Sequence, residues 1–304
     1  MRKLIALLAL TPILLAQEPK RPRILGVAHI ALFVSDIEKS RAFYKDFLGY
    51  SEPFKLDKPD GSLSLTFIKV NDRQYIELFP SLEPGADRLN HISIQTDNAE
   101  AMRAYLGSRG VKVPESVPKG RIKNSNFNVK DPDGHTVEIV QYEPDGWSLR
   151  EKGKFMTSTR ISDRMMHLGI IVGDLSAARK FYGDILGFHE IWRGSRDGKV
   201  LSWTNMQVPD GDDYIEFMLY KDLPEPDKRG TQHHICLVTP DIDQAKAKLE
   251  ARSGLYTKPM EIRTGTNRKR QMNLYDPDGT RIELMEPATI DGKPTPSSDA
   301  PPPR

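Results

Sequence analysis

The chain contains one long segment twice, and this duplication limits the folds that it can adopt. Residues 28–50 and 166–188 share a histidine, an aspartate seven positions later, and the motif Phe-Tyr-x-Asp-x-Leu-Gly. Residues 131–138 and 276–283 share Asp-Pro-Asp-Gly followed by a glutamate. A repeat that fills half of a 304-residue chain is typical of duplicated domains rather than of a short-period solenoid.

Each copy divides again into two units, so that we predict four units with the order strand, helix and three strands. Every unit has one histidine in its first strand and one glutamate in its last strand. In the first half the histidines lie 62 positions apart (29 and 91) and the glutamates 61 (77 and 138); in the second half both separations are 67. Loops vary in length more readily than strands, so the matched spacing indicates a repeated scaffold. The eight residues are His29, Glu77, His91, Glu138, His167, Glu216, His234 and Glu283.

Local signals place helices and turns between these strands. Asp36 can cap a helix that ends at Gly49, since glycine suits a left-handed C-terminal turn. A second helix is expected over residues 99–108. The two Asp-Pro-Asp-Gly segments predict tight turns, because proline presets the second position and glycine frees the fourth.

Composition indicates the domain limits. Residues 144–163 are polar and lack a period, so we place the boundary there and expect domains at 24–144 and 164–287. The segment 288–304 is rich in proline and serine, and we expect it to be a disordered tail.

The N-terminus resembles a secretory signal. Arg2 and Lys3 precede an apolar run from Leu4 to Leu15 that is too short to span a bilayer comfortably. We expect a signal peptide at residues 1–16 and a secreted or periplasmic protein; an uncleaved N-terminal anchor is the alternative. No later segment predicts membrane insertion.

Charge and cysteine content exclude several classes of function. The formal net charge of +2 argues against nucleic acid as the main partner, because phosphate binding needs a concentrated basic face. The single cysteine, Cys236, excludes an intramolecular disulfide and a multi-thiolate metal cluster.

The histidines and glutamates have the pattern of metal ligands. Alternate residues of a strand face opposite sides, so Glu138 and Glu283 should face away from their apolar neighbours and into a concavity. A buried carboxylate is costly unless it is paired or bound to a metal. Taken singly, a strand histidine is usually a core residue and a strand glutamate usually faces solvent. Eight such residues in register favour sites of two imidazoles and two carboxylates for Fe, Mn, Co, Ni or Zn.

Other polar residues are weaker candidates. Two basic clusters, at residues 119–123 and 268–270, are expected to be solvated loops, with contact to an anionic substrate as the alternative. His233 is interpreted as structural or surface, and His135 and His189 as solvated. Trp203, Phe127 and Met272 are expected either in the core or along the concavities.

The four units, the Phe-Tyr-x-Asp-x-Leu-Gly helix and the Asp-Pro-Asp-Gly turn before a glutamate strand resemble the vicinal oxygen chelate superfamily. This superfamily includes glyoxalase I, extradiol dioxygenases and bleomycin resistance proteins. The resemblance implies an α+β fold in which the four βαβββ units pair into two open, cup-shaped mixed sheets with helices on the outer face. It also implies that the eight histidines and glutamates named above bind divalent metal ions.

A full His-Glu-His-Glu set is similar to bacterial-type glyoxalase I, in which a carboxylate moves a proton α to a carbonyl. This likeness implies Glu138 and Glu283 as catalytic bases. Extradiol dioxygenases use two histidines and one glutamate, with an additional acid–base histidine that has no counterpart between His234 and Glu283.

We therefore expect a secreted, metal-dependent isomerase or lyase that acts on a small vicinal-oxygen substrate. A metal-dependent dioxygenase and a small-ligand binding or resistance protein are the alternatives. A homo-oligomer is possible. The sequence leaves open whether units one and two pair, or whether units one and four pair and bring His29 and Glu77 to His234 and Glu283.

Overall fold

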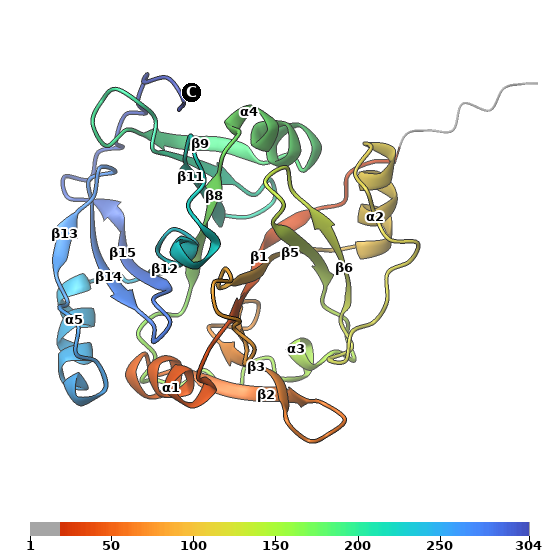
Figure 1. Ribbon diagram of the computed structural model, residues 1–304, viewed down its shortest axis with the longest axis horizontal. Coiled ribbons are helices and arrows are strands. Elements are labelled where there is room, and N and C mark those ends of the chain that lie inside the picture. Colours follow the sequence, from red (N-terminus) through yellow and green to blue (C-terminus); the bar gives the residue numbers. More distant parts are fainter. Residues whose placement is uncertain (1–18, 304) are drawn as a thin grey trace, which may run out of the picture.

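A computed structural model describes residues 19–303. The expected signal peptide lies outside the described residues, so its interpretation stays a prediction. The described chain forms two sheets of seven and eight strands, each with its own helices (Figure 1). Among the described residues, no helix is long and apolar enough to span a membrane.

The first domain contains units one and two. Its sheet has the strand order β2-β3-β4-β1-β5-β7-β6. Unit one consists of β1 (Ile24–Phe33), α1 (Ile37–Arg41), a π-helical continuation η1 (Ala42–Phe47), β2 (Ser51–Asp57), β3 (Leu63–Lys69) and β4 (Tyr75–Phe79). Unit two consists of β5 (Leu89–Thr96), α2 (Ala99–Ser108), β6 (Ser125–Lys130) and β7 (Thr136–Gln141). A short helix α3 (Trp147–Arg150) follows.

The second domain contains units three and four in an eight-stranded sheet of order β13-β14-β15-β12-β8-β11-β10-β9. Unit three consists of β8 (Met165–Val172), α4 (Leu175–Ala178), η2 (Arg179–Ile185), β9 (His189–Gly194), β10 (Trp203–Gln207) and β11 (Tyr214–Leu219). After η3 (Pro226–Thr231), unit four consists of β12 (His234–Val238), α5 (Ile242–Glu250), η4 (Ser253–Leu255), β13 (Ile262–Thr264), β14 (Lys269–Tyr275) and β15 (Arg281–Thr289).

Unit two has one strand fewer than predicted. The segment that should pair as its second strand contains Pro114 and Pro118 and makes only an isolated bridge between Lys119 and Ser125. Proline has no N–H to donate to a ladder, so two prolines in a short segment prevent continuous pairing. The first sheet therefore has seven strands.

The pairing of units is settled by the sheet order. In each domain the first and last strands of two consecutive units lie together, as β4-β1-β5-β7 and as β11-β8-β12-β15. Strand β1 runs parallel to β4 and antiparallel to β5, and β5 runs parallel to β7. The alternative in which units one and four share a sheet is wrong.

The predicted helix signals are confirmed. The Asp36 side chain accepts hydrogen bonds from the amides of Glu38 and Lys39, and Asn98 caps α2 in the same way. Gly49 has φ +82°, and a Cβ there would lie 2.2 Å from the Thr159 carbonyl oxygen. Glycine is thus required both by the backbone and by the close approach of the linker.

The helical segments pack between the two domains. The ring of Phe47 on η1 stacks on Tyr256 of the second domain with centroids 4.8 Å apart. The Tyr105 hydroxyl on α2 donates to the Ile185 carbonyl at the end of η2. One apolar core consequently runs from the first sheet through these helices to the second.

The segment after Thr289 differs from the disorder that we expect from its composition. The amide of Ser298 donates to the Arg193 carbonyl, and the amide of Leu201 donates to the Pro301 carbonyl. These two hydrogen bonds hold the tail against β9 and against the segment that precedes β10. Proline blocks regular structure but leaves carbonyl groups free to accept, which explains an ordered tail without a helix or strand.

Candidate metal centres

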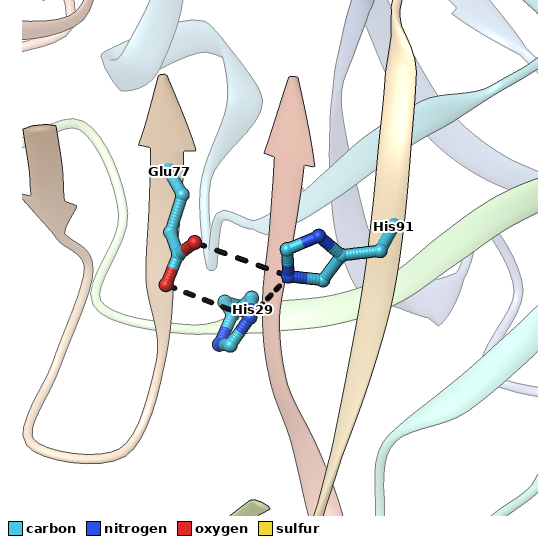
Figure 2. A group of neighbouring side chains, drawn as sticks. All are labelled: His29, Glu77 and His91. Atoms are coloured by element: carbon cyan, nitrogen blue, oxygen red, sulfur yellow. Dashed lines mark hydrogen bonds and ion pairs between the residues drawn. The ribbon is translucent and has the colours of Figure 1, made fainter. Parts of the chain in front are cut away.

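The predicted ligands of the first domain converge on the concave face of its sheet. His29, Glu77, His91 and Glu138 lie on β1, β4, β5 and β7, which are four adjacent central strands. Figure 2 shows His29, Glu77 and His91 pointing toward one another from three of these strands. Strand alternation turns the intervening apolar residues to the opposite face, into the core under the helices.

Donor atoms of His29, Glu77 and His91 lie within 4.8 Å of one another, and Glu138 lies close to both histidines. His29 Nε2 and His91 Nε2 lie 2.9 Å apart. Oxygens of Glu77 and Glu138 each lie 3.5 Å from His29 Nε2, and 3.9 and 3.8 Å from His91 Nε2. Ligand atoms about 2.1 Å from a shared ion lie about 3.0 to 3.4 Å apart in octahedral or tetrahedral geometry. Small movements inward would bring all four donors to one divalent ion.

Burial sets the protonation of the same group. It lowers the pKa of His91 to about 4 and that of His29 well below its usual value, so both imidazoles are neutral ligands. Burial raises the pKa of Glu138 to about 7. Burial and the neighbouring Glu138 raise the pKa of Glu77 well above normal. Two buried carboxylates resist ionising together without a cation between them, which fits a site for a divalent metal.

The donors of the first domain lie in a cavity of about 200 Å³. Its wall is largely apolar, and the Ser93 hydroxyl donates to Glu138 from the strand beside it at 3.2 Å. Arg121 lies on the wall, with its guanidinium bonded to the Asp57 carbonyl and the Ser64 hydroxyl. The apolar wall residues are Leu56, Leu65, Phe67, Tyr75, Phe79, Ile122, Val140 and Tyr142.

The second domain repeats the arrangement on β8, β11, β12 and β15 with His167, Glu216, His234 and Glu283. The two Nε2 atoms lie 3.0 Å apart. Glutamate oxygens lie 3.3 to 3.9 Å from them. Burial lowers the pKa of His167 to about 3, and burial raises the pKa of Glu283 to about 7 against the opposing effect of Arg281.

Both histidines of the second centre are completely buried. His234 packs against Gly169, where a Cβ would lie 1.9 Å from the imidazole ring, so only glycine fits that position. Cys236 replaces the serine that corresponds to it in the first domain, and its sulfur groups with donor atoms of His167 and Glu283 within 4.8 Å. This thiol was not predicted as a site residue, although its position two residues after His234 could have indicated it.

The remaining sequence candidates separate clearly. The second domain also has a cavity, of about 340 Å³, which is lined by Glu216, Glu283 and Trp203. Phe127 and Met272 instead lie in the core on the other face of the sheets. Of the basic loops, Arg268 and Arg270 are engaged by Asp291 and Asp243. Lys119 and Lys123 both lie near Asp145.

The three other histidines have different surroundings. His189 is exposed, as expected. His233 is buried, with Nδ1 3.1 Å from Asp87, in agreement with a structural role. The prediction that His135 is solvated is wrong, because its ring lies 2.8 Å from Asp131 and edge-on to His233 between the domains. The duplication gave no signal for this, since His135 has no equivalent in the other half.

Comparison with known proteins agrees with this geometry. The family model of the glyoxalase/bleomycin resistance protein/dioxygenase superfamily matches residues 26–139 and 164–284. The chain is 23% identical over 304 residues to a lactoylglutathione lyase of Schizosaccharomyces pombe, covering 85% of this chain and 95% of the relative.

Solved structures show the same fold. A mutant of homoprotocatechuate 2,3-dioxygenase from Brevibacterium fuscum superposes with TM-score 0.66 at 20% identity, covering 93% of this chain and 76% of that one. The Mn(II)-bound glyoxalase from Novosphingobium aromaticivorans gives TM-score 0.66 at 16% identity, covering 91% and 85%. The protein described here therefore belongs to the glyoxalase/bleomycin resistance protein/dioxygenase superfamily and contains two tandem copies of its domain, consistent with a metal-dependent enzyme.

Proposed function

We propose that the protein is a secreted, divalent-metal-dependent isomerase or lyase that moves a proton on a small vicinal-oxygen substrate. The observation that carries this proposal is the first-domain centre, in which two neutral imidazoles and two carboxylates face a cavity. Because four protein groups can bind the ion, one carboxylate can dissociate from it and act as a base while the other three remain bound. The donor set suits Fe, Mn, Co, Ni or Zn.

His29, Glu77, His91 and Glu138 would hold the ion of the first domain, and His167, Glu216, His234 and Glu283 that of the second. A bound divalent ion supplies a Lewis acid that polarises the substrate carbonyl and offsets negative charge on its oxygen. The imidazoles contribute neutral nitrogen ligands because burial keeps them unprotonated.

Glu138 is the proposed base of the first domain. Its carboxylate lies at the cavity wall, where it can reach a substrate, and burial disfavours its charged form, raising its pKa in the metal-free fold to about 7. It would accept the proton from the hydroxyl-bearing carbon α to the carbonyl and deliver it to the former carbonyl carbon, while the hydroxyl proton passes to the former carbonyl oxygen. Ser93 holds the carboxylate in place, and the apolar wall binds the carbon skeleton. Glu283 is the corresponding base of the second domain.

Metal content and proton exchange test this function. Elemental analysis of the purified protein should find divalent metal. After a chelator has removed this metal, added divalent ions should bind to the protein again. The metal-loaded protein should exchange the α-protons of hydroxyacetone or of a methylglyoxal hemithioacetal in D2O, followed by NMR. Measured in a Glu283→Gln background, in which only the first centre can act, Glu138→Gln should lower that exchange by roughly a hundredfold or more. A protein that binds no divalent ion would instead support a ligand-binding or resistance protein.

A metal-dependent dioxygenase is the second candidate, because the first cavity has aromatic walls that suit a catechol ring. The fold that the chain shares with homoprotocatechuate 2,3-dioxygenase makes this reaction worth testing. Among the described residues lining the two cavities, however, the only histidines are the ligand candidates His29 and His91. Oxygen uptake with catechol by the Fe(II)-loaded protein would favour this candidate.

Secretion rests on the sequence of residues 1–16 alone. Expression of the full chain followed by mass spectrometry should show a mature protein that begins near Gln17, and a retained N-terminus would favour the anchor. Size-exclusion chromatography with light scattering tests whether it is a homo-oligomer.

A further inference from the structure

The second centre carries a thiol that the first centre lacks. Cys236 follows His234 by two positions on β12, so both side chains lie on the same face of the sheet. In the strand register it lies directly opposite His167 on β8 and Glu283 on β15, which are both proposed ligands. Residues opposite one another on neighbouring strands lie side by side, so the buried thiol is adjacent to two ligands.

The sulfur of Cys236 belongs to the donor atoms that surround this centre. It lies within 4.8 Å of donor atoms of His167 and Glu283, and the group formed by His167, Glu216 and His234 meets the same limit. A sulfur about 2.3 Å and a nitrogen or oxygen about 2.1 Å from a shared ion lie about 3.1 to 3.6 Å apart. An inward movement of the side chains therefore brings Sγ to the same ion.

Two methionines extend the sulfur-rich surroundings of the second centre. Met166 and Met285 pack with Cys236 and Tyr214 in a buried cluster that is separate from the main apolar core. The corresponding residues of the first domain, none of which contains sulfur, are Ala28, Val140 and Ser93. The duplication thus preserved the histidines and glutamates of the two centres, whereas soft sulfur atoms gather at the second centre alone.

The charge around the second centre suits an additional anionic ligand. Arg281 Nη2 lies 2.8 Å from His234 Nδ1. Lys269 on β14 is half-buried, and the nearby charges of Cys236 and Glu283 oppose the lowering of its pKa by burial. The equivalent residues of the first domain are uncharged, namely Thr136 and Asn124. A thiolate beside two carboxylates exceeds the charge of a divalent ion, and these two extra cations offset the excess.

We propose that Cys236 is a metal ligand and that the second centre holds a thiophilic ion such as Zn(II), whereas the first centre binds its ion through nitrogen and oxygen alone. When the ion binds, the thiol releases its proton to solvent and Sγ binds as the thiolate. Thiolate ligands favour Zn(II) over the hard ion Mn(II). The two centres of one chain then hold different ions. The inference rests on the metal binding in the proposed function and is independent of the reaction.

Cobalt(II) tests this ligand, because a thiolate bonded to Co(II) gives a charge-transfer band in the near ultraviolet. Cys236 is the single cysteine of the chain, so any such band arises from this residue. The full protein is freed of metal by a chelator under reducing conditions and titrated with Co(II), and calorimetry counts the bound ions. The band should saturate at one ion per chain.

Two variants assign the band. Cys236→Ser, which installs the first-domain residue, should abolish it, and Glu138→Gln, which disables the first centre, should retain it. Co(II) bound by the Glu138→Gln protein without the band would overturn the thiolate ligand alone. Failure of the protein to bind any Co(II) would overturn this ligand together with the proposed metal-dependent function, so the two failures are distinguishable.

Metal selectivity gives a second measurement. In the Glu138→Gln background, in which only the second centre binds, Cys236→Ser should lower the affinity for Cd(II) at least about tenfold and the affinity for Mn(II) by less. An equal loss for both ions, or no loss for Cd(II), would contradict the proposal. Should Cys236→Ser fail to fold by circular dichroism, the band in the wild-type chain and its retention in Glu138→Gln still decide.

Discussion

The Tyr44 hydroxyl donates a hydrogen bond to the carboxylate of Asp276, 3.1 Å away in the other domain. The Tyr182 hydroxyl of the second domain makes the equivalent hydrogen bond to Asp131 of the first domain, at 3.0 Å. The Phe-Tyr helices and the Asp-Pro-Asp-Gly turns are therefore not only local signals. Each motif of one domain binds the other motif of its partner domain, so the duplicated sequence encodes its own interface.

Tyr44→Phe should destabilise the protein by about 1 to 3 kcal/mol, because it removes the hydroxyl that bonds a buried carboxylate. Urea unfolding should show this as a lower midpoint. Tyr220→Phe is the matched control, since the Tyr220 hydroxyl has no hydrogen-bond partner among the described residues, and it should have little effect. Equal stability of the two variants would mean that the contact contributes nothing.

Divalent metal should stabilise the protein at two separate centres. Titration with Zn(II) or Mn(II) should raise the melting temperature, and elemental analysis should give two ions per chain. Glu138→Gln and Glu283→Gln should each remove about one ion and leave the other, because the centres lie on different sheets. Loss of both ions in either single variant would contradict independent centres.

Metal binding should weaken as the pH falls through about 7. Burial raises the pKa of Glu138 and of Glu283 to about 7 in the metal-free fold, so each carboxyl is protonated below that pH. The ion binds only the carboxylate, and binding must release the proton. Apparent affinity should fall at least about tenfold for each pH unit below 7. Calorimetry in buffers with different ionisation enthalpies should detect the released proton, and a flat profile from pH 5 to 8 would refute the assignment.

Much of the site could be predicted from sequence, because the alternation of side chains between the two faces of a strand depends only on neighbouring residues. Alternate residues of a strand face the same side, so the pattern of neighbouring residues predicts which face His29 and Glu138 occupy. The matched spacing of the histidines and glutamates then places them on equivalent strands of their units. The fold class and the family are confirmed. Sheet order settled the pairing of units, which sequence left open because His29 could have met either His91 or His234.

The features that sequence reasoning missed depend on contacts between distant residues. The position of Arg281 beside His234 follows from packing across the second sheet, and nothing in its own strand pattern distinguishes it from a solvated arginine. His135 was misinterpreted because its neighbour His233 is brought to it by domain packing. The lost strand of unit two was readable from Pro114 and Pro118, but the repeat outweighed that local signal.

Ser93→Ala should move the pH midpoint of metal binding by the first domain upward. The Ser93 hydroxyl donates to Glu138 and lowers its pKa against the larger effect of burial. Without this donor the protonated carboxyl is favoured, and the midpoint should rise by up to about one pH unit, equivalent to one charge-assisted hydrogen bond. The pH series is best measured in a Glu283→Gln background, in which only the first centre binds.

Ser125→Ala removes a comparable hydroxyl that donates to Glu143 at 2.6 Å. It should leave the midpoint of metal binding in place, because Glu143 is not a proposed ligand. Ser93→Cys, which installs the residue of the second domain, should lie between wild type and Ser93→Ala, since a thiol is a weaker donor. An unchanged or lowered midpoint in Ser93→Ala would show that the serine does not tune Glu138, and that burial alone sets the pH at which the first centre accepts its ion.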